Sequence, residues 1–466
     1  MATAPRFSTM AVPPATAART LGWRTGLACA TVLLGLALLP TAQAAPTGPA
    51  VLDAGASDPD KLGWMQGFPP PEDKRIRYTD SDYFSFPKLR WTACHFRQLM
   101  PTVGVSRGTG AATPLPQQLD AGIDALPFTP LNTATRMTWA QSLQANYTDG
   151  IIVLHDGVVV YERYAGCLEA QGQHGAMSVT KSVTGLLGEM LVAEGVIDEN
   201  ETVGTIIPEL AHSAFADATV RQVLEMTTAL RYSEDYADPN AEVWQYAAAG
   251  STLPPAPGYR GPRSYYEYLQ TVRRQGRHGD GFGYKTINTD ALGWIIARRT
   301  GKPVSTLLSE RIWRHLGAEQ DAYYTVDSSG TPFAGGGFNA GLRDLARLGQ
   351  LLLDDGRAHG EQIVPAAAIA RIRAGGDKRA FAKAGYALLP GWSYRGMWWV
   401  SHNPHGAYMA RGVHGQALYI DPTARVVIAR FGSHPIAGNS ANDPTTLPAF
   451  DALARYLMTR PVAAGP

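Results

Sequence analysis

The chain has 466 residues, which is enough for one large domain or two packed lobes. Hydrophobic residues make up 45% of it and charged residues 17%, a composition typical of globular proteins and not of disordered ones. The 41 Lys and Arg residues balance 40 Asp and Glu residues to a net charge of +1, and no basic stripe is present. This charge pattern excludes the electrostatic signature of a nucleic-acid-binding protein.

The N-terminus has the pattern of a cleaved secretory signal. Arginines at positions 6, 19 and 24 precede an apolar run over residues 27–39, which is followed by the small-residue site Ala42-Gln43-Ala44. This arrangement predicts a signal peptide over residues 1–44. The apolar run is shorter than the ~20 residues that a membrane-spanning helix needs, so we expect no membrane anchor after cleavage. We therefore expect a periplasmic or secreted bacterial protein with a Sec-type signal.

Two cysteines, Cys94 and Cys167, remain after this cleavage. Three cysteines in all are too few for a disulfide scaffold, but an oxidising compartment would allow these two to pair. Pairing also requires their Cα atoms to lie close together, which sequence does not show. The sequence is compatible with a disulfide between these cysteines and with two free thiols.

The mature chain divides into an extension and a main body. Residues 45–135 are rich in proline and turn residues but contain aromatic residues that need burial, which predicts an irregular, ordered extension. The main body, residues 136–466, starts with a short helix near Thr138. A β-hairpin follows over residues 151–161, because Asp156-Gly157 separates two runs rich in β-branched residues.

Helical periodicity then dominates from Ser178 to about Ala374, with an amphipathic helix running from Ser178 through Leu191. Short β-rich segments return late in the chain, at residues 407–411, 416–420 and 426–431. A helix over residues 447–458 follows them. Strands at both ends with helices between them predict an α+β fold. We expect one antiparallel sheet built from both chain ends, flanked by helices, with an inserted and mostly helical lobe.

A nucleophile-elbow pattern, Gly-x-Ser-x-Gly, occurs around Ser106. That motif requires a strand before the serine and a helix after it. The residues from Thr109 to Pro116 contain two prolines and no helical period, so we interpret this segment as a loop. An α/β-hydrolase that uses Ser106 is the rival enzyme hypothesis.

A second serine has better surroundings. Ser178-Val179-Thr180-Lys181 follows the small residues Gly175-Ala176 and opens the predicted helix, where positions i and i+3 share one face. Lys181 could then take a proton from the Ser178 hydroxyl, and the free N–H at the helix start could bind an oxyanion. The alternative is an ordinary helix N-cap followed by a surface lysine.

Two later segments are candidate parts of the same site. Tyr284 stands just before a predicted helix, where a tyrosine can act as a general acid or base. The glycine-rich stretch from Arg411 to Gln416 enters a strand and would let a ligand lie along the strand edge. His402, His405 and His414 are close in sequence, but no carboxylate or metal-binding pattern accompanies them, so we interpret them as loop histidines and predict no metal site.

In this order, the features resemble the serine β-lactamase and penicillin-binding-protein superfamily. Within it the chain is similar to class C β-lactamase-related proteins, and especially to 6-aminohexanoate-dimer hydrolases. The resemblance covers roughly residues 138–460 and rests on the amino-acid sequence of the segments 177–182, 226–236 and 288–294.

The resemblance implies a role for each matching residue. Ser178 would be the acylated nucleophile, Lys181 its proton acceptor and Tyr284 the catalytic tyrosine. Tyr236 resembles the tyrosine that contacts the scissile amide in nylon-oligomer hydrolases, with Tyr232 as the alternative. Thr286 stands where many relatives have an asparagine that contacts substrate.

The strand motif Lys-Thr-Gly of the superfamily maps onto Val413-His414-Gly415, so its lysine is missing. With this alignment His414 and Gly415 are expected to bind substrate, and the N–H groups of Ser178 and Gln416 are expected to form the oxyanion hole.

The resemblance implies a secreted serine hydrolase that cleaves a small amide or ester through an acyl-enzyme, without a metal or organic cofactor. The alternative is a non-catalytic or weakly catalytic periplasmic protein that keeps the fold and recognises peptide-like ligands. We expect a small-molecule substrate and no nucleic-acid partner; the sequence leaves the oligomeric state open.

Overall fold

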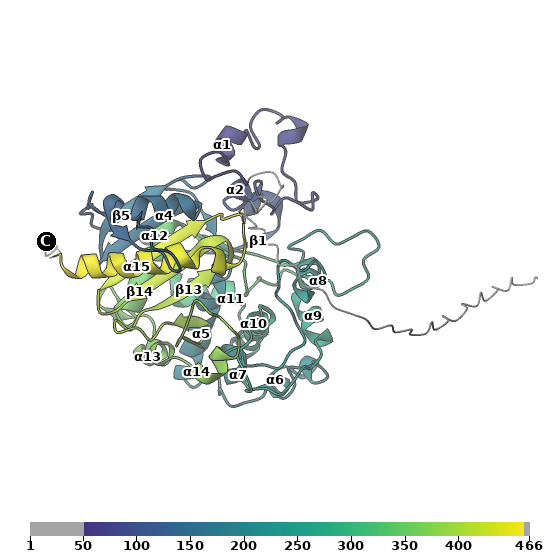
Figure 1. The fold of residues 1–466 in the computed structure, drawn as a ribbon. Coiled ribbons are helices and arrows are strands. Elements are labelled where there is room, and N and C mark those ends of the chain that lie inside the picture. The colour runs from purple at the N-terminus through teal and green to yellow at the C-terminus, as the bar shows by residue number, and fades with distance from the viewer. Residues whose placement is uncertain (1–50, 461–466) are drawn as a thin grey trace, which may run out of the picture. The chain divides into compact units, whose positions relative to one another are not determined.

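A seven-stranded antiparallel sheet forms the centre of the computed structural model, which describes residues 51–460 (Figure 1). Its strand order is β11-β12-β13-β14-β15-β4-β5. Two strands come from early in the main body and five from its end: β4 (Thr148–His155), β5 (Val158–Tyr164), β11 (Ser393–Arg395), β12 (Trp398–Val400), β13 (Tyr408–Gly412), β14 (Gln416–Asp421) and β15 (Val426–Gly432). The predicted sheet from both chain ends is thereby confirmed. The predicted signal peptide lies outside the described residues.

The hairpin between β4 and β5 forms where the sequence predicts it. Asp156 and Gly157 both have positive φ angles, 48° and 79°, as a tight turn between twisted strands requires. β4 then pairs with β15, so the hairpin joins the C-terminal strands in one sheet.

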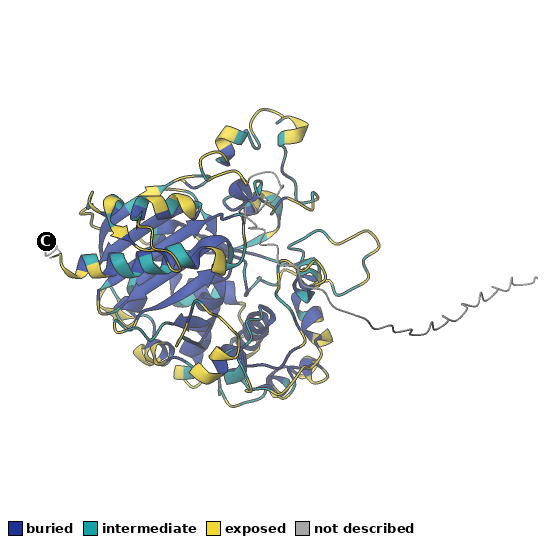
Figure 2. Cartoon of the chain, viewed as in Figure 1, coloured by how far each residue is buried: buried dark blue, intermediate teal, exposed yellow. Residues whose placement is uncertain are grey.

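Helices cover both faces of this sheet. In β14, Leu418 packs against α12 (Leu342–Leu353) beside Gly349, while the next residue, Tyr419, contacts Phe450 of α15 (Asp443–Met458). Successive residues of a strand point to opposite faces, so α12 and α15 lie on opposite sides. α4 (Trp139–Ala145), capped by Thr138, packs beside α15 through a contact between Trp139 and Phe450. Figure 2 shows that the strands between these helices are buried.

The inserted lobe contains most of the remaining helices. They are α5 (Val179–Ala193), α6 (Val203–Ile206), α7 (Val220–Leu224), α8 (Glu242–Ala249), α9 (Tyr265–Thr271), α10 (Ile287–Thr300), α11 (Val304–Arg311), α13 (Ala366–Ala374) and α14 (Lys378–Ala382). The expectation of an amphipathic α5 is wrong, because every residue from Val179 to Leu191 is buried. α5 is a central helix, packed against α10, α11, α13 and strands β12–β14.

A second, four-stranded sheet is not predicted by the sequence pattern. Its order is β1-β7-β8-β6, with β1 (Thr102–Val105), β7 (Ala322–Thr325), β8 (Phe338–Ala340) and β6 (His174–Gly175). Two minor pairs complete the strands: β2 (Pro127–Phe128) with β3 (Met137–Thr138), and β9 (Arg357–Ala358) with β10 (Glu361–Gln362). Gly104 and Val105 of the Gly-x-Ser-x-Gly segment end β1, and no helix follows until Ile123, so the predicted loop is confirmed from Ser106 onward.

The extension is ordered through three short helices, α1 (Pro59–Leu62), α2 (Leu89–Thr92) and α3 (Phe96–Leu99). Contacts place it in one compact unit with the main body, and strand β1 pairs with β7 of that body. A disulfide between Cys94 and Cys167, 73 residues apart, ties the two together, so the structure selects pairing for these cysteines.

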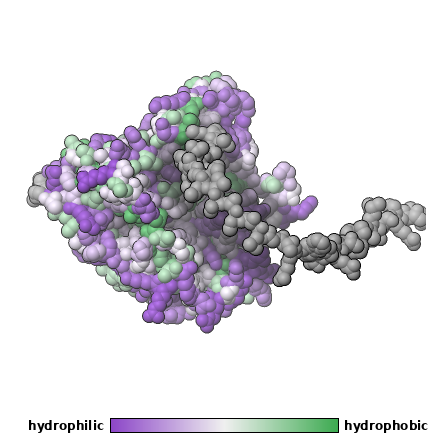
Figure 3. Space-filling view, in the orientation of Figure 1, coloured by the Kyte–Doolittle hydropathy of each residue, from purple (hydrophilic) through white to green (hydrophobic). Residues whose placement is uncertain are grey.

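The visible surface is mainly hydrophilic, with scattered hydrophobic residues (Figure 3). Among the described residues, no helix combines the length and apolar character needed to cross a membrane.

Candidate active site

Ser178 and Lys181 are in direct contact at the start of α5. Ser178 stands one residue before the helix, after Met177, whose φ of 46° turns the chain into it. Lys181 Nζ lies 2.8 Å from Ser178 Oγ, as the i, i+3 spacing predicts, and donates a second hydrogen bond of 2.6 Å to the carbonyl of Gly335. Both side chains are buried, with 7% of Ser178 and 1% of Lys181 exposed. Ser178 is at the N-cap position but makes no capping hydrogen bond through its side chain, and Lys181 is buried, so the alternative of an ordinary N-cap beside a surface lysine is wrong.

Burial sets the protonation of Lys181. Removal from water lowers the pKa of its ammonium, while the charges of Glu234 and Asp290 act in the opposite direction. Burial also raises the pKa of Asp290 to about 7. A lysine with a lowered pKa presents a free amine more readily, and a free amine 2.8 Å from a hydroxyl can accept its proton.

Tyr284 lies against the same pair. The Lys181 ammonium is 5.1 Å from the centre of its ring, and the ring packs on Trp399 and Tyr394 at centroid distances of 5.5 and 6.2 Å. Burial raises the pKa of Tyr284 well above its usual value, and the nearby charge of Glu234 adds to the shift, while a hydrogen bond with Ser178 opposes it. Tyr284 is therefore a neutral phenol near pH 7, suited to passing a proton onward rather than to removing one unaided.

Glu234 is a functional candidate that the sequence pattern does not reveal. Its carboxylate accepts hydrogen bonds from the Thr286 N–H at 2.6 Å, the Thr286 hydroxyl at 2.7 Å and the Tyr236 hydroxyl at 2.6 Å. It therefore fixes two of the predicted substrate-binding residues relative to each other. The acid lies in a turn-rich segment, where no period or motif distinguishes it from its neighbour Asp235.

A cavity of about 160 Å³ opens beside Ser178. Tyr236 lines it, whereas Tyr232 is buried against Tyr246 and Tyr268, so the structure favours Tyr236 of the two tyrosines. Thr286 also lines it. The other lining residues are mostly apolar: Tyr83, Phe84, Phe96, Met100, Met177, Val243, Trp244, Tyr246, Ala247, Leu253, Phe333 and Val413.

The strand entrance differs from the predicted alignment. A Cβ added to Gly412 would lie 2.9 Å from the Ala176 carbonyl and 3.0 Å from the Ser178 nitrogen, so Gly412 is the glycine that approaches the nucleophile. The residue after it, Val413, lines the cavity. Gln416, the expected oxyanion donor, does not line the cavity. Its side chain is buried and donates hydrogen bonds to the carbonyls of Val413 and Gly432.

The other two residues of that alignment also lie elsewhere. His414 is buried, donates a hydrogen bond from Nδ1 to the His434 carbonyl at 2.7 Å, and does not line the cavity. Burial lowers its pKa to about 4, so it is neutral at pH 7. Gly415 faces Arg430 and Asn146 rather than Ser178. The predicted alignment takes Gly415 as the glycine of the strand motif. It fails because Gly412, three positions earlier, fits the same short motif.

The three histidines considered above have separate partners: His402 contacts Ser393, His405 contacts Asp421, and His414 contacts the His434 carbonyl. Within residues 51–460, the only grouping of three potential metal ligands is Cys94, Cys167 and His174, and both of its sulfurs are in the disulfide.

The main body is similar to known proteins. The β-lactamase family model matches residues 140–444. The chain belongs to the β-lactamase family. It is 36% identical over 351 residues to the 6-aminohexanoate-dimer hydrolase of Paenarthrobacter ureafaciens, covering 75% of this chain and 86% of that protein. It is thus a hydrolase with the β-lactamase fold.

Solved structures share the architecture. A Bacillus anthracis protein with a provisional 6-aminohexanoate-dimer hydrolase assignment superposes with a TM-score of 0.76 at 31% identity, covering 84% of this chain and all of that one. A hydrolase with promiscuous acyltransferase activity, EstCE1, has a TM-score of 0.54 at 15% identity, covering 68% and 96% of the two chains. The second likeness concerns the fold alone.

The close approach of Gly412 generates a first prediction. In Gly412→Ala the new methyl group would press on the Ser178 N–H and the Ala176 carbonyl, so we expect kcat/KM to fall by roughly 10²-fold, the usual effect of disturbing one oxyanion donor. Steady-state kinetics on an activated ester would measure it. Gly104→Ala is the matched control, because its methyl group would meet no atom within 4 Å. Equal kcat/KM values for Gly412→Ala and Gly104→Ala would contradict the placement of Gly412 against the nucleophile.

The charge of Glu234 generates a second prediction. Glu234 opposes the lowering of the Lys181 pKa, so Glu234→Gln should lower that pKa further. Lys181 would then stay unprotonated to lower pH, and the acid limb of the kcat/KM profile should move to lower pH. Asp235→Asn, which neutralises the adjacent exposed carboxylate, should leave the limb in place. A limb that moves to higher pH in Glu234→Gln would show that another group controls it.

Proposed function

We propose that this protein cleaves a small linear amide or ester through an acyl-enzyme on Ser178, in the manner of 6-aminohexanoate-dimer hydrolases and related esterases. The observation that carries the proposal is the buried contact between Ser178 Oγ and Lys181 Nζ at the edge of a cavity. The name of the Paenarthrobacter ureafaciens relative supports a linear amide as one substrate class.

The chemistry proceeds in two halves. Lys181 accepts the Ser178 proton while Oγ bonds to the substrate carbonyl carbon, and the carbonyl electron pair moves onto oxygen. When that pair returns, the bond to the leaving nitrogen or oxygen breaks. The leaving atom takes a proton from the Tyr284 hydroxyl, and the proton held on Lys181 replaces it. Water then attacks the acyl-enzyme with the same groups, releasing the acid and restoring Ser178.

We assign the oxyanion hole to the N–H groups of Ser178 and Val413. Ser178 supplies an amide at the start of α5, where N–H groups have no partner within the helix. Val413 follows the glycine that touches the Ser178 nitrogen and lines the cavity, which supports it over Gln416.

The nucleophile can be tested directly. We expect a fluorophosphonate probe to add one adduct to the wild-type protein and to Ser106→Ala, and none to Ser178→Ala, because Ser178, unlike Ser106, contacts a lysine base. Intact-protein mass spectrometry measures the adduct, and circular dichroism shows that each variant is folded. An adduct on Ser106 would favour the rival nucleophile, and a folded wild type without any adduct would favour a binding protein.

The charges around the cavity favour neutral substrates. Among the described residues that line it, Lys181 is the only cation, and it is engaged with Ser178 and the Gly335 carbonyl. Arg411 is buried, paired with Asp443 and stacked 4.9 Å from the Trp399 ring, so it does not substitute for the lysine that the strand motif lacks. A substrate carboxylate would therefore lack a charge-assisted partner, a contact worth about 1.5–3 kcal/mol or roughly ten- to a hundredfold in affinity.

The lack of a free cation among the described residues that line the cavity predicts which substrates are hydrolysed fastest. We expect short-chain p-nitrophenyl esters, and linear amides without charged ends, to be hydrolysed with a kcat/KM at least tenfold above that of nitrocefin or benzylpenicillin. Side-by-side kinetics on one enzyme preparation decide the matter. A preference for the β-lactams would contradict this prediction, because it would require a second cation that binds the substrate carboxylate.

We also propose that the protein is exported. The signal-like N-terminus and the disulfide both support an oxidising compartment. In the native bacterium, the exported form should begin at Ala45, which N-terminal sequencing of periplasmic and culture-medium fractions would establish. A protein recovered from the cytoplasm with its first 44 residues intact would contradict the proposal.

A further inference from the structure

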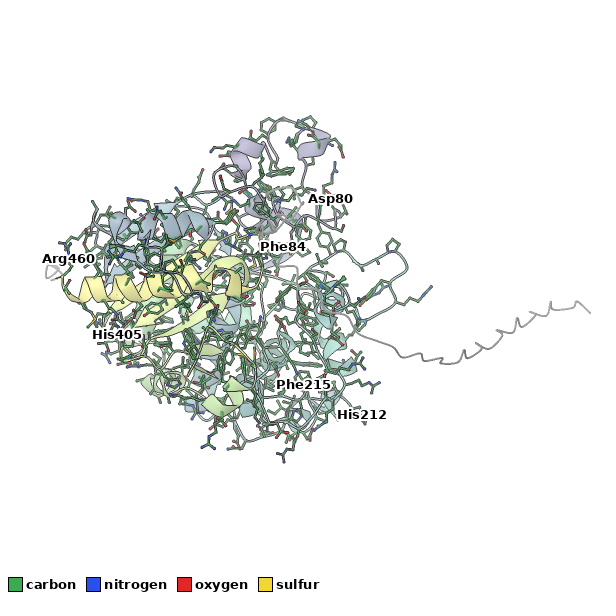
Figure 4. The ribbon with its side chains drawn as sticks, viewed as in Figure 1. Asp80, Phe84, His212, Phe215, His405 and Arg460 are labelled. Carbon is green, nitrogen blue, oxygen red and sulfur yellow. A yellow bond between two sulfur atoms is a disulfide. The ribbon has the colours of Figure 1, made fainter. Side chains whose placement is uncertain are left out.

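The extension forms one wall of the cavity beside Ser178. Four of its side chains line that cavity: Tyr83, Phe84, Phe96 and Met100, here called the extension wall. All four precede residue 140, where the match to the β-lactamase family begins. Phe84 is labelled in Figure 4, where the extension meets the main body.

The extension wall is held firmly in place. The hydroxyl of Tyr83 donates to the Thr252 carbonyl across the cavity, and that of Tyr78 donates to the Ser251 carbonyl at 3.0 Å. Thr92 donates to the Tyr83 carbonyl at 2.6 Å. The Cys94–Cys167 disulfide fixes the same segment from the other side. A wall with this many attachments is present before substrate arrives.

The wall touches the reacting centre. Tyr83, Phe96 and Met100 belong to an apolar cluster that includes Met177, next to the nucleophile, and Val413 packs against that cluster. The Phe84 ring lies 5.7 Å from the Phe96 ring and meets the His414 ring edge-on at 5.4 Å. Because His414 is neutral at pH 7, the wall offers apolar surface and no charge near the proposed oxyanion hole.

The two sides of the scissile bond face different surroundings. The leaving atom must face Tyr284, whose ring packs on Trp399 and Tyr394 of the large sheet, and neither belongs to the apolar cluster of the extension. The other substituent of the carbonyl carbon then lies in the cavity, where the extension wall packs with Met177 and Val413 beside the proposed oxyanion hole.

We propose that the extension wall is the acyl-binding subsite, and that it selects substrates with an uncharged, apolar acyl group. This inference rests on the acyl-enzyme chemistry proposed for Ser178. Because apolar groups bind by the area they remove from water, a longer acyl chain should gain from contact with Phe84.

The test varies the acyl chain and keeps the leaving group constant. For the full chain, we expect kcat/KM for p-nitrophenyl hexanoate to exceed that for p-nitrophenyl acetate. Phe84→Ala should lower this hexanoate-to-acetate ratio about tenfold, within the range that pocket contacts usually provide, and Phe84→Leu should lower it about threefold. Phe68→Ala is the matched control, because Phe68 belongs to the same extension and is fully exposed. It should keep the wild-type ratio.

The outcomes separate this inference from the proposed function. An unchanged ratio in Phe84→Ala, with Ser178 still labelled by a fluorophosphonate, would overturn the acyl subsite and leave the nucleophile standing. If Phe84→Ala does not fold, as judged by circular dichroism, an unchanged ratio in Phe84→Leu would overturn it equally. A folded wild type that neither reacts with the probe nor hydrolyses either ester would overturn both.

Discussion

The burial of the Lys181 amine is the constraint on which this site depends. A charged ammonium is costly to remove from water, so the fold surrounds it with acceptors and negative charge. The Gly335 carbonyl and Ser178 Oγ lie within hydrogen-bond distance, the Tyr284 ring covers one side, and Glu234 and Asp290 contribute charge. These groups come from widely separated parts of the chain, so the reactive pair exists only once the lobe and the sheet have packed together.

The far end of α5 is fixed as strongly as its start. Glu189 is fully buried and accepts hydrogen bonds from Arg221 at 2.7 Å and Arg371 at 2.8 Å. Midway along, a Cβ on Gly185 would collide with the Gly396 carbonyl, so the helix lies directly on the turn between β11 and β12. A helix held at both ends cannot rotate freely, and the direction in which Ser178 points is fixed with it.

Local patterns predict well those features whose determinants are local. The hairpin at Asp156-Gly157 depends on two residues that tolerate positive φ, and the Ser178–Lys181 contact depends on one turn of helix. The choice between Gly412 and Gly415 depends on which glycine meets Ala176 and Ser178, more than 200 residues earlier, and a short motif carries no such information. The role of Glu234 and the second sheet escape prediction for the same reason, because Thr286 lies 52 residues after Glu234 and β1 pairs with β7, which is more than 200 residues later.

The separation of the extension wall from the catalytic residues has a consequence for divergence among relatives. The wall is supplied by residues 83–100, whereas Ser178, Lys181 and Tyr284 lie in the segment that matches the family model. Substitutions in the extension can therefore reshape one side of the cavity while the groups around the Lys181 amine, among them Gly335 and Tyr284, stay the same. Homologous enzymes with the same reactive core and unrelated N-terminal segments should differ mainly in the width of the substrate range they accept, and grafting such segments between them would be a route to new selectivity.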